Sequence, residues 1–289
     1  MRCTLLGLAN LIIAMAANAQ AAPSTDIYLA PLSMRDGRAV VGTPVNITNR
    51  SGYDNQPSFT PDSRAILFTS THEDGQSDIY RYDIASRRIS RVTSTPESEY
   101  SATVMPDGRR FSVIRVEEDS TQRLWSFALD GSDPRILIED LKPVGYHAWI
   151  DGNNLALFVL GQPNALVHTD RRTGKSDTLA RRIGRSLRPL PDHSGFSFVR
   201  QTDSTSTVVA ATWPGFATHD LIDLPRRAQD VAWLSDQTLL VGSGSSLLVW
   251  KKGMTSWSPL IDLAAQGVKG ITRLAISPDA KWLAMVATE

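Results

Sequence analysis

The sequence predicts an all-β fold, a six-bladed β-propeller built from four-stranded antiparallel blades. Three observations lead to this prediction. A turn containing Asp recurs six times at intervals of 41 to 45 residues, most intervals contain further strand candidates, and the two ends of the chain together supply the blade that neither completes alone. A period of about 40–50 residues with four strands is typical of propeller blades.

The stretch 57–93, PSFTPDSRAILFTSTHEDGQSDIYRYDIASRRISRVT, shows the repeating unit most clearly. A short apolar strand precedes the turn at Pro61 and Asp62, and residues 65–68 follow it as an apolar β run. Residues 78–83 and 89–93 are the third and fourth strand candidates, and no segment of helical periodicity separates them. The unit is therefore interpreted as one blade of four strands.

Each copy of the unit has an apolar residue, a turn containing Asp and then a β run. Pro and Asp favour such turns because Pro presets φ and Asp accepts hydrogen bonds from its own backbone. We expect these carboxylates to be structural, and the loss of one to cost about 0.5–2 kcal/mol. The six turn residues are Asp62, Asp107, Asp151, Asp192, Asp236 and Asp279.

The two ends of the chain each carry part of a blade. Residues 274–288 contain only a first and a second strand, whereas residues 26–29 repeat the third-strand pattern of residues 78–81. Residues 40–41 and 45–48 then supply a fourth strand. We therefore predict that the N-terminal strands complete the C-terminal blade, because a shared blade closes the ring and removes free sheet edges.

Residues 1–19 are predicted to be a secretory signal peptide. Arg2 provides the positive start, and residues 5–17 form an apolar stretch that is too short for a transmembrane helix. The A-x-A pattern places the cleavage near Ala19, with Ala22 as the alternative. The mature protein is therefore expected in the periplasm or outside the cell.

The mature chain, residues 23–289, is expected to form one propeller domain without a transmembrane segment. The full sequence balances 30 basic against 30 acidic side chains, so net charge gives no argument for a nucleic-acid partner or an anionic membrane. The one cysteine, Cys3, lies within the predicted signal peptide. Cleavage would leave no thiol for a disulfide, a metal ligand or a nucleophile.

The segments PSFTPDSRAILFTS, SDIYRYDIASRRISRVT and ISPDAKWLAMVA resemble the TolB-type β-propeller repeat, also called PD40 or WD40-like. The resemblance is strong in the first, second and last blades and weaker in blades three to five, where Pro is lost before Asp151 and Asp236. It implies a free-standing periplasmic or secreted propeller. TolB proper has an additional N-terminal α/β domain, which residues 23–56 cannot hold.

Polar residues suited to ligand binding lie just before or within the first strand of each blade. Because chain direction alternates within a blade, these segments are expected to converge at one mouth of the central channel, opposite the Asp turns. They suit a polar ligand, but they can equally serve to solvate and cross-link the rim. Arg185 and Arg188 are candidates for holding an anionic group. The candidate binding residues are Tyr53, Asp54, Gln56, Glu99, Tyr100, Tyr146, His147, Arg185, Arg188, Asp230 and Arg273.

The sequence predicts no catalytic residue, metal site or cofactor. His147, beside Tyr146 and Trp149, is more typical of a hydrogen-bonded packing residue than of a base or metal ligand. The sequence contains no H-E-x-x-H zinc motif, no calcium loop and no phosphate loop.

These features favour a monomeric, exported, non-enzymatic adaptor that binds a protein or peptide of the cell envelope through the channel mouth. The alternative is a hydrolase or lyase acting on a carbohydrate or lactone in the channel, with Asp54, Glu99, Asp230 and His147 as the candidate acids and bases. A third hypothesis is a scaffold in an envelope complex that binds no small ligand. The first is favoured because an enzyme site usually leaves a recognisable constellation of residues.

Overall fold

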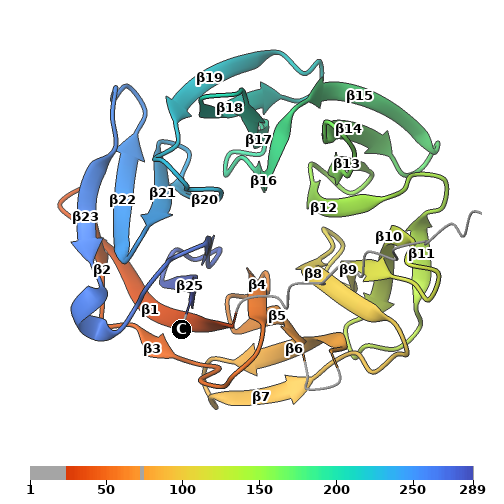
Figure 1. Ribbon diagram of the computed structural model, residues 1–289, viewed down its shortest axis with the longest axis horizontal. Helices are drawn as coiled ribbons and strands as arrows, with labels where there is room; N and C mark the ends of the chain where they lie inside the picture. The colour runs from red at the N-terminus through yellow and green to blue at the C-terminus, as the bar shows by residue number, and fades with distance from the viewer. Residues whose placement is uncertain (1–23, 72–74, 289) are drawn as a thin grey trace, which may run out of the picture.

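Six β-sheets surround a central channel as the blades of a propeller (Figure 1). The structure is a computed structural model that describes residues 24–71 and 75–288. It confirms the predicted all-β, six-bladed fold. The signal peptide predicted for residues 1–19, with both cleavage positions, lies outside the described residues. Within the described ranges, no helix is long and apolar enough to cross a membrane.

In each of the first five blades the chain runs from the innermost strand to the outermost through four antiparallel strands. The first blade consists of β4 (Asp54–Phe59), β5 (Ala65–Thr71), β6 (Ser77–Asp83) and β7 (Arg88–Arg91). The second consists of β8 (Ser98–Val104), β9 (Arg110–Val116), β10 (Gln122–Ala128) and β11 (Arg135–Ile138). The third consists of β12 (Val144–Trp149), β13 (Asn154–Val159), β14 (Ala165–Asp170) and β15 (Lys175–Arg181). The fourth consists of β16 (Ile183–Pro189), β17 (Gly195–Gln201), β18 (Ser206–Thr212) and β19 (Thr218–Asp223). The fifth consists of β20 (Val231–Ser235), β21 (Thr238–Ser243), β22 (Ser246–Lys251) and β23 (Ser258–Asp262), and the short 3-10 helix η1 (Ala264–Gln266) follows it.

The sixth blade is built from both ends of the chain. Its inner strands are β24 (Arg273–Ile276) and β25 (Trp282–Thr288), and β1 (Thr25–Arg35) comes next in the same sheet. β1 pairs antiparallel with β25 over seven residue pairs, from Thr25 opposite Thr288 to Pro31 opposite Trp282. The prediction that the N-terminal strand completes the C-terminal blade is therefore confirmed.

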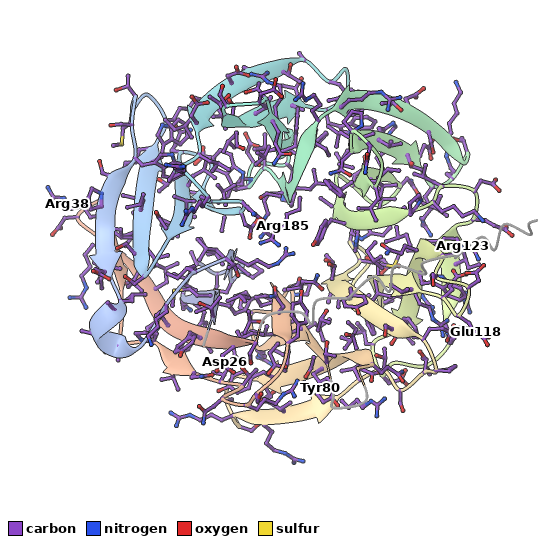
Figure 2. All side chains as sticks on the ribbon, in the orientation of Figure 1. Asp26, Arg38, Tyr80, Glu118, Arg123 and Arg185 are labelled. Atoms are coloured by element: carbon purple, nitrogen blue, oxygen red, sulfur yellow. The ribbon has the colours of Figure 1, made fainter. Side chains whose placement is uncertain are left out.

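The fourth strand of this blade forms in two separate pieces. β2 (Arg38–Val41) pairs with the part of β1 that extends beyond β25, whereas β3 (Val45–Asn46) pairs further back along β1. Pro44 lies between the pieces and has no N–H to donate to a ladder. The segment after β3 is held by Asp26 of β1, whose carboxylate accepts hydrogen bonds from Asn46 Nδ2 at 2.7 Å and Thr48 Oγ1 at 2.8 Å (Figure 2).

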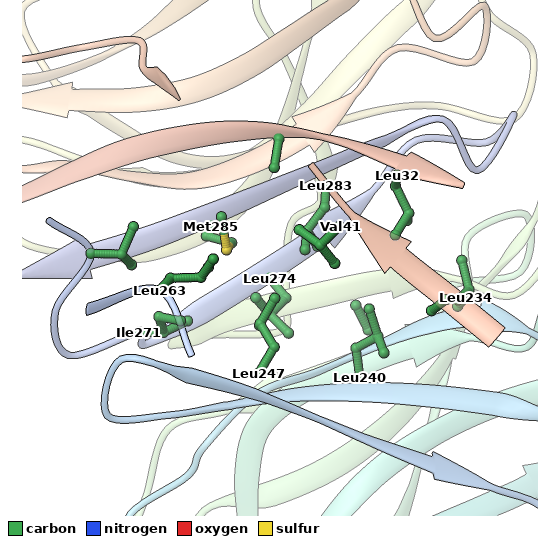
Figure 3. Packing of buried hydrophobic residues seen from close by; sticks show 14 of the residues in the cluster. Leu32, Val41, Leu234, Leu240, Leu247, Leu263, Ile271, Leu274, Leu283 and Met285 are labelled. Carbon is green, nitrogen blue, oxygen red and sulfur yellow. The ribbon is translucent and has the colours of Figure 1, made fainter. Parts of the chain in front are cut away.

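Apolar side chains alternate along each strand and pack against the blades on both sides. Among the described residues they form six clusters, one at each boundary between neighbouring blades. In β1, Ile27 and Leu29 pack toward the first blade, whereas Ala30 and Leu32 pack toward the fifth (Figure 3). This alternation follows from the two-residue period of a strand. The sixth blade is therefore joined to both neighbours by residues from both ends of the chain.

Five of the six turn carboxylates accept a hydrogen bond from the backbone N–H two residues further on. These five are Asp62, Asp107, Asp151, Asp192 and Asp279, with N···O distances from 2.8 to 3.1 Å. The fifth blade differs, because the hydroxyl of Ser235 accepts from the N–H of Gln237 at 3.3 Å, and among the described residues the carboxylate of Asp236 bonds only the side chain of Gln237. The same turn is thus stabilised by a different side chain in that blade.

Replacing Asp151 with alanine is expected to lower the free energy of unfolding by about 1 kcal/mol. Its carboxylate accepts hydrogen bonds from the backbone N–H of Asn154 at 2.9 Å and from Trp213 Nε1 of the next blade at 3.1 Å, and all of these would be lost. The matched control is Asp236→Ala, which we expect to change stability by less than about 0.5 kcal/mol. Urea unfolding followed by tryptophan fluorescence measures both, and equal losses would contradict the difference seen between the turns.

Candidate functional site

The first strands of the six blades surround the channel, and their side chains line three adjoining cavities. The mouth cavity, about 270 Å³, lies at the end opposite the Asp turns and is lined by residues such as Tyr53, Gln229 and Thr272. The middle cavity, about 80 Å³, is lined largely by polar side chains. The turn-side cavity, about 530 Å³, is lined by residues such as Pro191 and Trp233. A ligand entering from the mouth would therefore pass from the mouth cavity into a narrower polar section.

Bulges in the inner strands direct polar side chains toward the channel axis. The register of β4 against β5 shifts around Gln56, and that of β8 against β9 shifts around Ser101. Gln56 at φ 58° and Ser101 at φ 56° both take the left-handed conformation, and both line the middle cavity. A bulge bends its strand locally and changes where its side chains point. Gln56 Oε1 also accepts from the N–H of Ser101 at 2.8 Å, which connects the first two blades.

Arg188 and Asp230 form a cross-link between the fourth, fifth and sixth blades. Arg188 Nη2 lies 2.7 Å from Asp230 Oδ2 and also donates to the carbonyl of Leu274 at 2.8 Å. Asp230 is buried and accepts further hydrogen bonds from Ser186 Oγ and from the N–H of Leu274. Burial raises the pKa of this carboxyl, but Arg188, then Arg273 and the hydrogen bonds from Ser186 and Leu274 hold it below its usual value. Both charges are thus satisfied within the protein.

Arg273 occupies the junction of the mouth and middle cavities and forms no ion pair with a carboxylate of the described residues, although its charge helps to lower the pKa of Asp230. Its guanidinium lies 4.9 Å from the ring centroid of Tyr146 and donates to the hydroxyl of that residue at 2.8 Å. The residue is only 7 % exposed, and its Nε has no hydrogen-bond acceptor among the described residues. Part of the guanidinium is therefore buried without a polar partner.

Arg185 lies at the same junction and reaches toward the centre of the ring (Figure 2). It donates to the carbonyl of Thr272 at 3.1 Å, while its Nε has no acceptor among the described residues. Burial and then the neighbouring charge of Arg273 lower the pKa of Arg185. Two guanidiniums therefore face the same part of the channel.

Tyr53 adds a phenol to the mouth cavity. Burial raises its pKa to about 12, against the opposing effect of Arg273. The hydroxyl therefore keeps its proton at physiological pH and can donate a hydrogen bond to a ligand.

His147 faces the boundary between the middle and turn-side cavities, and its Nε2 lies 2.7 Å from Ser112 Oγ. The same hydroxyl accepts from Trp149 Nε1 at 2.9 Å, so the three side chains form a buried polar group. Burial lowers the pKa of His147 to about 4, which leaves the imidazole neutral at pH 7.

Asp54, Glu99 and Tyr100 do not line any of the three cavities. Asp54 is buried and pairs with Arg50 at 2.7 Å. Glu99 is buried and lies 3.3 Å from Arg115 Nε, with a hydrogen bond from Thr95 Oγ1 at 2.5 Å. The structure thus brings the other candidates to the channel, namely Tyr53, Gln56, Tyr146, His147, Arg185, Arg188, Asp230 and Arg273.

Several lining residues were not among the sequence candidates, and two of them are Ser101 and Arg227. Ser101 lines the middle cavity, and Arg227 lines the mouth cavity. Ser101 follows Tyr100 at the position that Gln56 has in the first blade, so the repeat spacing could have identified it. Arg227 lies in the connection before β20, where no strand pattern indicates the direction of a side chain.

Within residues 24–71 and 75–288, no group of three or more His, Cys, Asp or Glu side chains is placed to hold a metal ion. The charged side chains that line the mouth and middle cavities are four arginines and one aspartate, and guanidiniums do not bind cations. The arrangement can donate hydrogen bonds to an anionic or carbonyl-bearing group.

Residues 13–143 match the family model described as the TolB beta propeller domain, PD40. This match confirms the resemblance drawn from the repeat segments. Beyond the matched residues, the structure continues the same four-stranded blades around the ring.

Solved structures of several proteins share the fold. A candidate TolB from Agrobacterium tumefaciens is 15 % identical, with a TM-score of 0.73, and the match covers 93 % of this chain and 99 % of that one. A gluconolactonase from Xanthomonas campestris is 8 % identical, with a TM-score of 0.64 and coverage of 93 % and 99 %. An oligogalacturonate lyase from Vibrio parahaemolyticus is 11 % identical, with a TM-score of 0.55 and coverage of 92 % and 98 %. At these identities the likeness establishes the fold alone.

Proposed function

We propose that this chain, which carries the TolB-type β-propeller repeat, is an exported, non-enzymatic adaptor that binds a protein or peptide of the cell envelope through its channel mouth. The observation that best supports this proposal is how the channel uses its charged groups. Asp230 is held by Arg188, whereas Arg185 and Arg273 keep N–H groups without an acceptor among the described residues. Unused donors in a narrow channel favour binding of a polar segment.

The alternative, a hydrolase or lyase acting on a carbohydrate or lactone, needs an acid and a base within reach of one substrate. Glu99 has a pKa raised to about 7 by burial, a value suited to proton transfer, but it pairs with Arg115 between two blades and does not line the channel. His147 is neutral and bonded to Ser112. These placements favour the adaptor.

Two matched variants test the mouth as the binding surface. Gln229 and Gln237 are both exposed and flank β20 at opposite ends, one at the mouth and the other in the Asp turn. We expect Gln229→Trp to reduce the recovery of the partner from an envelope fraction at least about tenfold, because the indole would fill part of the mouth cavity. Gln237→Trp should retain it.

Quantitative mass spectrometry of proteins captured by the wild type and by both variants measures this effect. A partner lost with Gln237→Trp and retained with Gln229→Trp would move the binding surface to the opposite face. Turnover of oligogalacturonate or of a sugar lactone by the purified protein would instead favour the enzyme. Export is checked separately, since the processed protein should begin at Gln20, or at Pro23 if cleavage follows Ala22.

A further inference from the structure

We propose that the junction of the mouth and middle cavities is a carboxylate-binding site in which Arg185 and Arg273 hold one carboxylate group. The inference rests on the proposed function for the source of that group, which is the peptide segment admitted through the mouth. A guanidinium presents a planar set of N–H donors that matches the two oxygens of a carboxylate.

The first observation is where the unsatisfied polar atoms gather. Seven buried side-chain nitrogen or oxygen atoms of the described residues have no hydrogen-bond partner. Four of them belong to residues that line the middle cavity, namely Arg185 Nε, Arg273 Nε, Ser101 Oγ and His147 Nδ1. Buried polar atoms are nearly always bonded, so a convergence of four around one cavity indicates a surface that is completed by a polar ligand.

The second observation is the uncompensated charge. Arg273 is 93 % removed from solvent, and among the described residues its polar contact is the neutral hydroxyl of Tyr146. Removing a guanidinium from water without an anion is costly, and a second guanidinium beside it adds repulsion. The lowered pKa of Arg185, caused by burial and then by Arg273, agrees with this reading.

The third observation is the balance of charges around the two cavities. Their described lining residues include four arginines, Arg185, Arg188, Arg227 and Arg273, and one carboxylate, Asp230. Asp230 is ion-paired with Arg188, and its charge also acts on Arg185 and Arg273, so a single carboxylate faces four guanidiniums. A carboxylate at the junction would meet an excess of positive charge in a confined space, where the attraction is stronger than in bulk water.

The size of the two cavities suggests how a peptide would enter. The middle cavity, about 80 Å³, has room for a small group only, whereas the mouth cavity, about 270 Å³, can take the residues that precede it. Tyr53 and Tyr146 flank the path with phenol groups. A chain end or an acidic side chain would thus anchor in the junction while the rest of the segment contacts the mouth.

The test measures binding of three probes by calorimetry: N-acetylglycylglycine, its C-terminal amide, and D-glucuronate as a carboxylate that is not a peptide. We expect the free acid to bind at least about tenfold more tightly than the amide, because the amide cannot neutralise the guanidiniums. Arg185→Gln and Arg273→Gln should each abolish this preference, whereas Arg185→Lys should retain part of it. The matched control is Arg181→Gln on the exposed face of β15, which should retain all of it.

A second readout does not depend on ligand. If Arg185 and Arg273 are kept side by side for ligand binding at a cost in stability, replacing one of them should relieve the repulsion between the two charges. The thermal midpoint of the free protein should then rise by about 2–4 °C. Equal binding of acid and amide, or an unchanged preference in both glutamine variants, would overturn the carboxylate site.

The two proposals fail in different ways. Arginine-dependent binding of glucuronate without binding of either peptide would keep the carboxylate site and overturn the peptide adaptor. A partner captured through the mouth, with no carboxylate preference in any probe, would keep the adaptor and overturn this site.

Discussion

Replacing Ile27 with alanine is expected to lower the free energy of unfolding by about 3 kcal/mol. Ile27 is fully buried in β1, and it packs with Phe59, Ile66 and Phe68 of the first blade. The truncation would leave a cavity at the boundary where the N-terminal strand joins the last blade to the first. The expected loss of stability is large because the boundary between the sixth and first blades closes the ring.

The matched control is Ile89→Ala in the outer strand β7, where the side chain is 41 % exposed. We expect that variant to change stability by less than about 1 kcal/mol, because little apolar surface is lost to water. Guanidinium unfolding monitored by tryptophan fluorescence and far-UV circular dichroism gives both values. A loss at Ile27 no larger than at Ile89 would mean that pairing of the chain ends contributes little to the stability of the ring.

Replacing Glu99 with glutamine is expected to stabilise the protein at pH 8 by up to about 3 kcal/mol, and to have little effect near pH 4.5. Burial raises the pKa of Glu99 from 4.5 to about 7, although Thr95 and Arg115 act in the opposite direction. Between these two values the folded protein binds more protons than the unfolded chain. The stability contributed by Glu99 is therefore present below about pH 4.5 and is lost as pH rises to about 7.

The measurement is the difference in unfolding free energy between wild type and Glu99→Gln at several pH values from 4.5 to 8. Glutamine resembles the protonated acid in shape and keeps an oxygen for the hydroxyl of Thr95, so the difference isolates the titration of one group. The control is Glu118→Gln, because Glu118 is exposed near the outer edge of the second blade (Figure 2). A difference that does not change with pH would show that Arg115 compensates the buried charge fully.

The candidate site was predictable in location but not in detail. The inner-strand segments converge on the channel as expected, because every blade starts at the axis with the same chain direction. Asp54 and Glu99 nevertheless turn away from it, each toward an arginine, Arg50 or Arg115. Adjacent residues of a strand point to opposite faces, and a bulge changes that alternation. A shift of one position therefore decides whether a side chain faces the channel or the boundary between two blades.

The pairing of the arginines shows the same limit. Sequence proximity suggested Arg185 with Arg188, but Arg188 is engaged by Asp230, and Arg273 of the sixth blade lies beside Arg185 instead. Arg185 and Arg188 both belong to β16, whereas Arg273 belongs to β24, far along the chain. Which side chains lie next to each other across the channel depends on how the blades close into a ring. Local sequence patterns do not determine this.

By itself, the sequence determined the blade number, the four-strand unit and the sharing of the last blade, because turn residues and two-residue periodicity recur at regular spacing and act locally. Only the tertiary structure decided which charges neutralise one another. Among the described residues, Arg185 and Arg273 form no ion pair with a carboxylate because Asp230 is paired with Arg188, and that outcome depends on three blades meeting around one narrow channel.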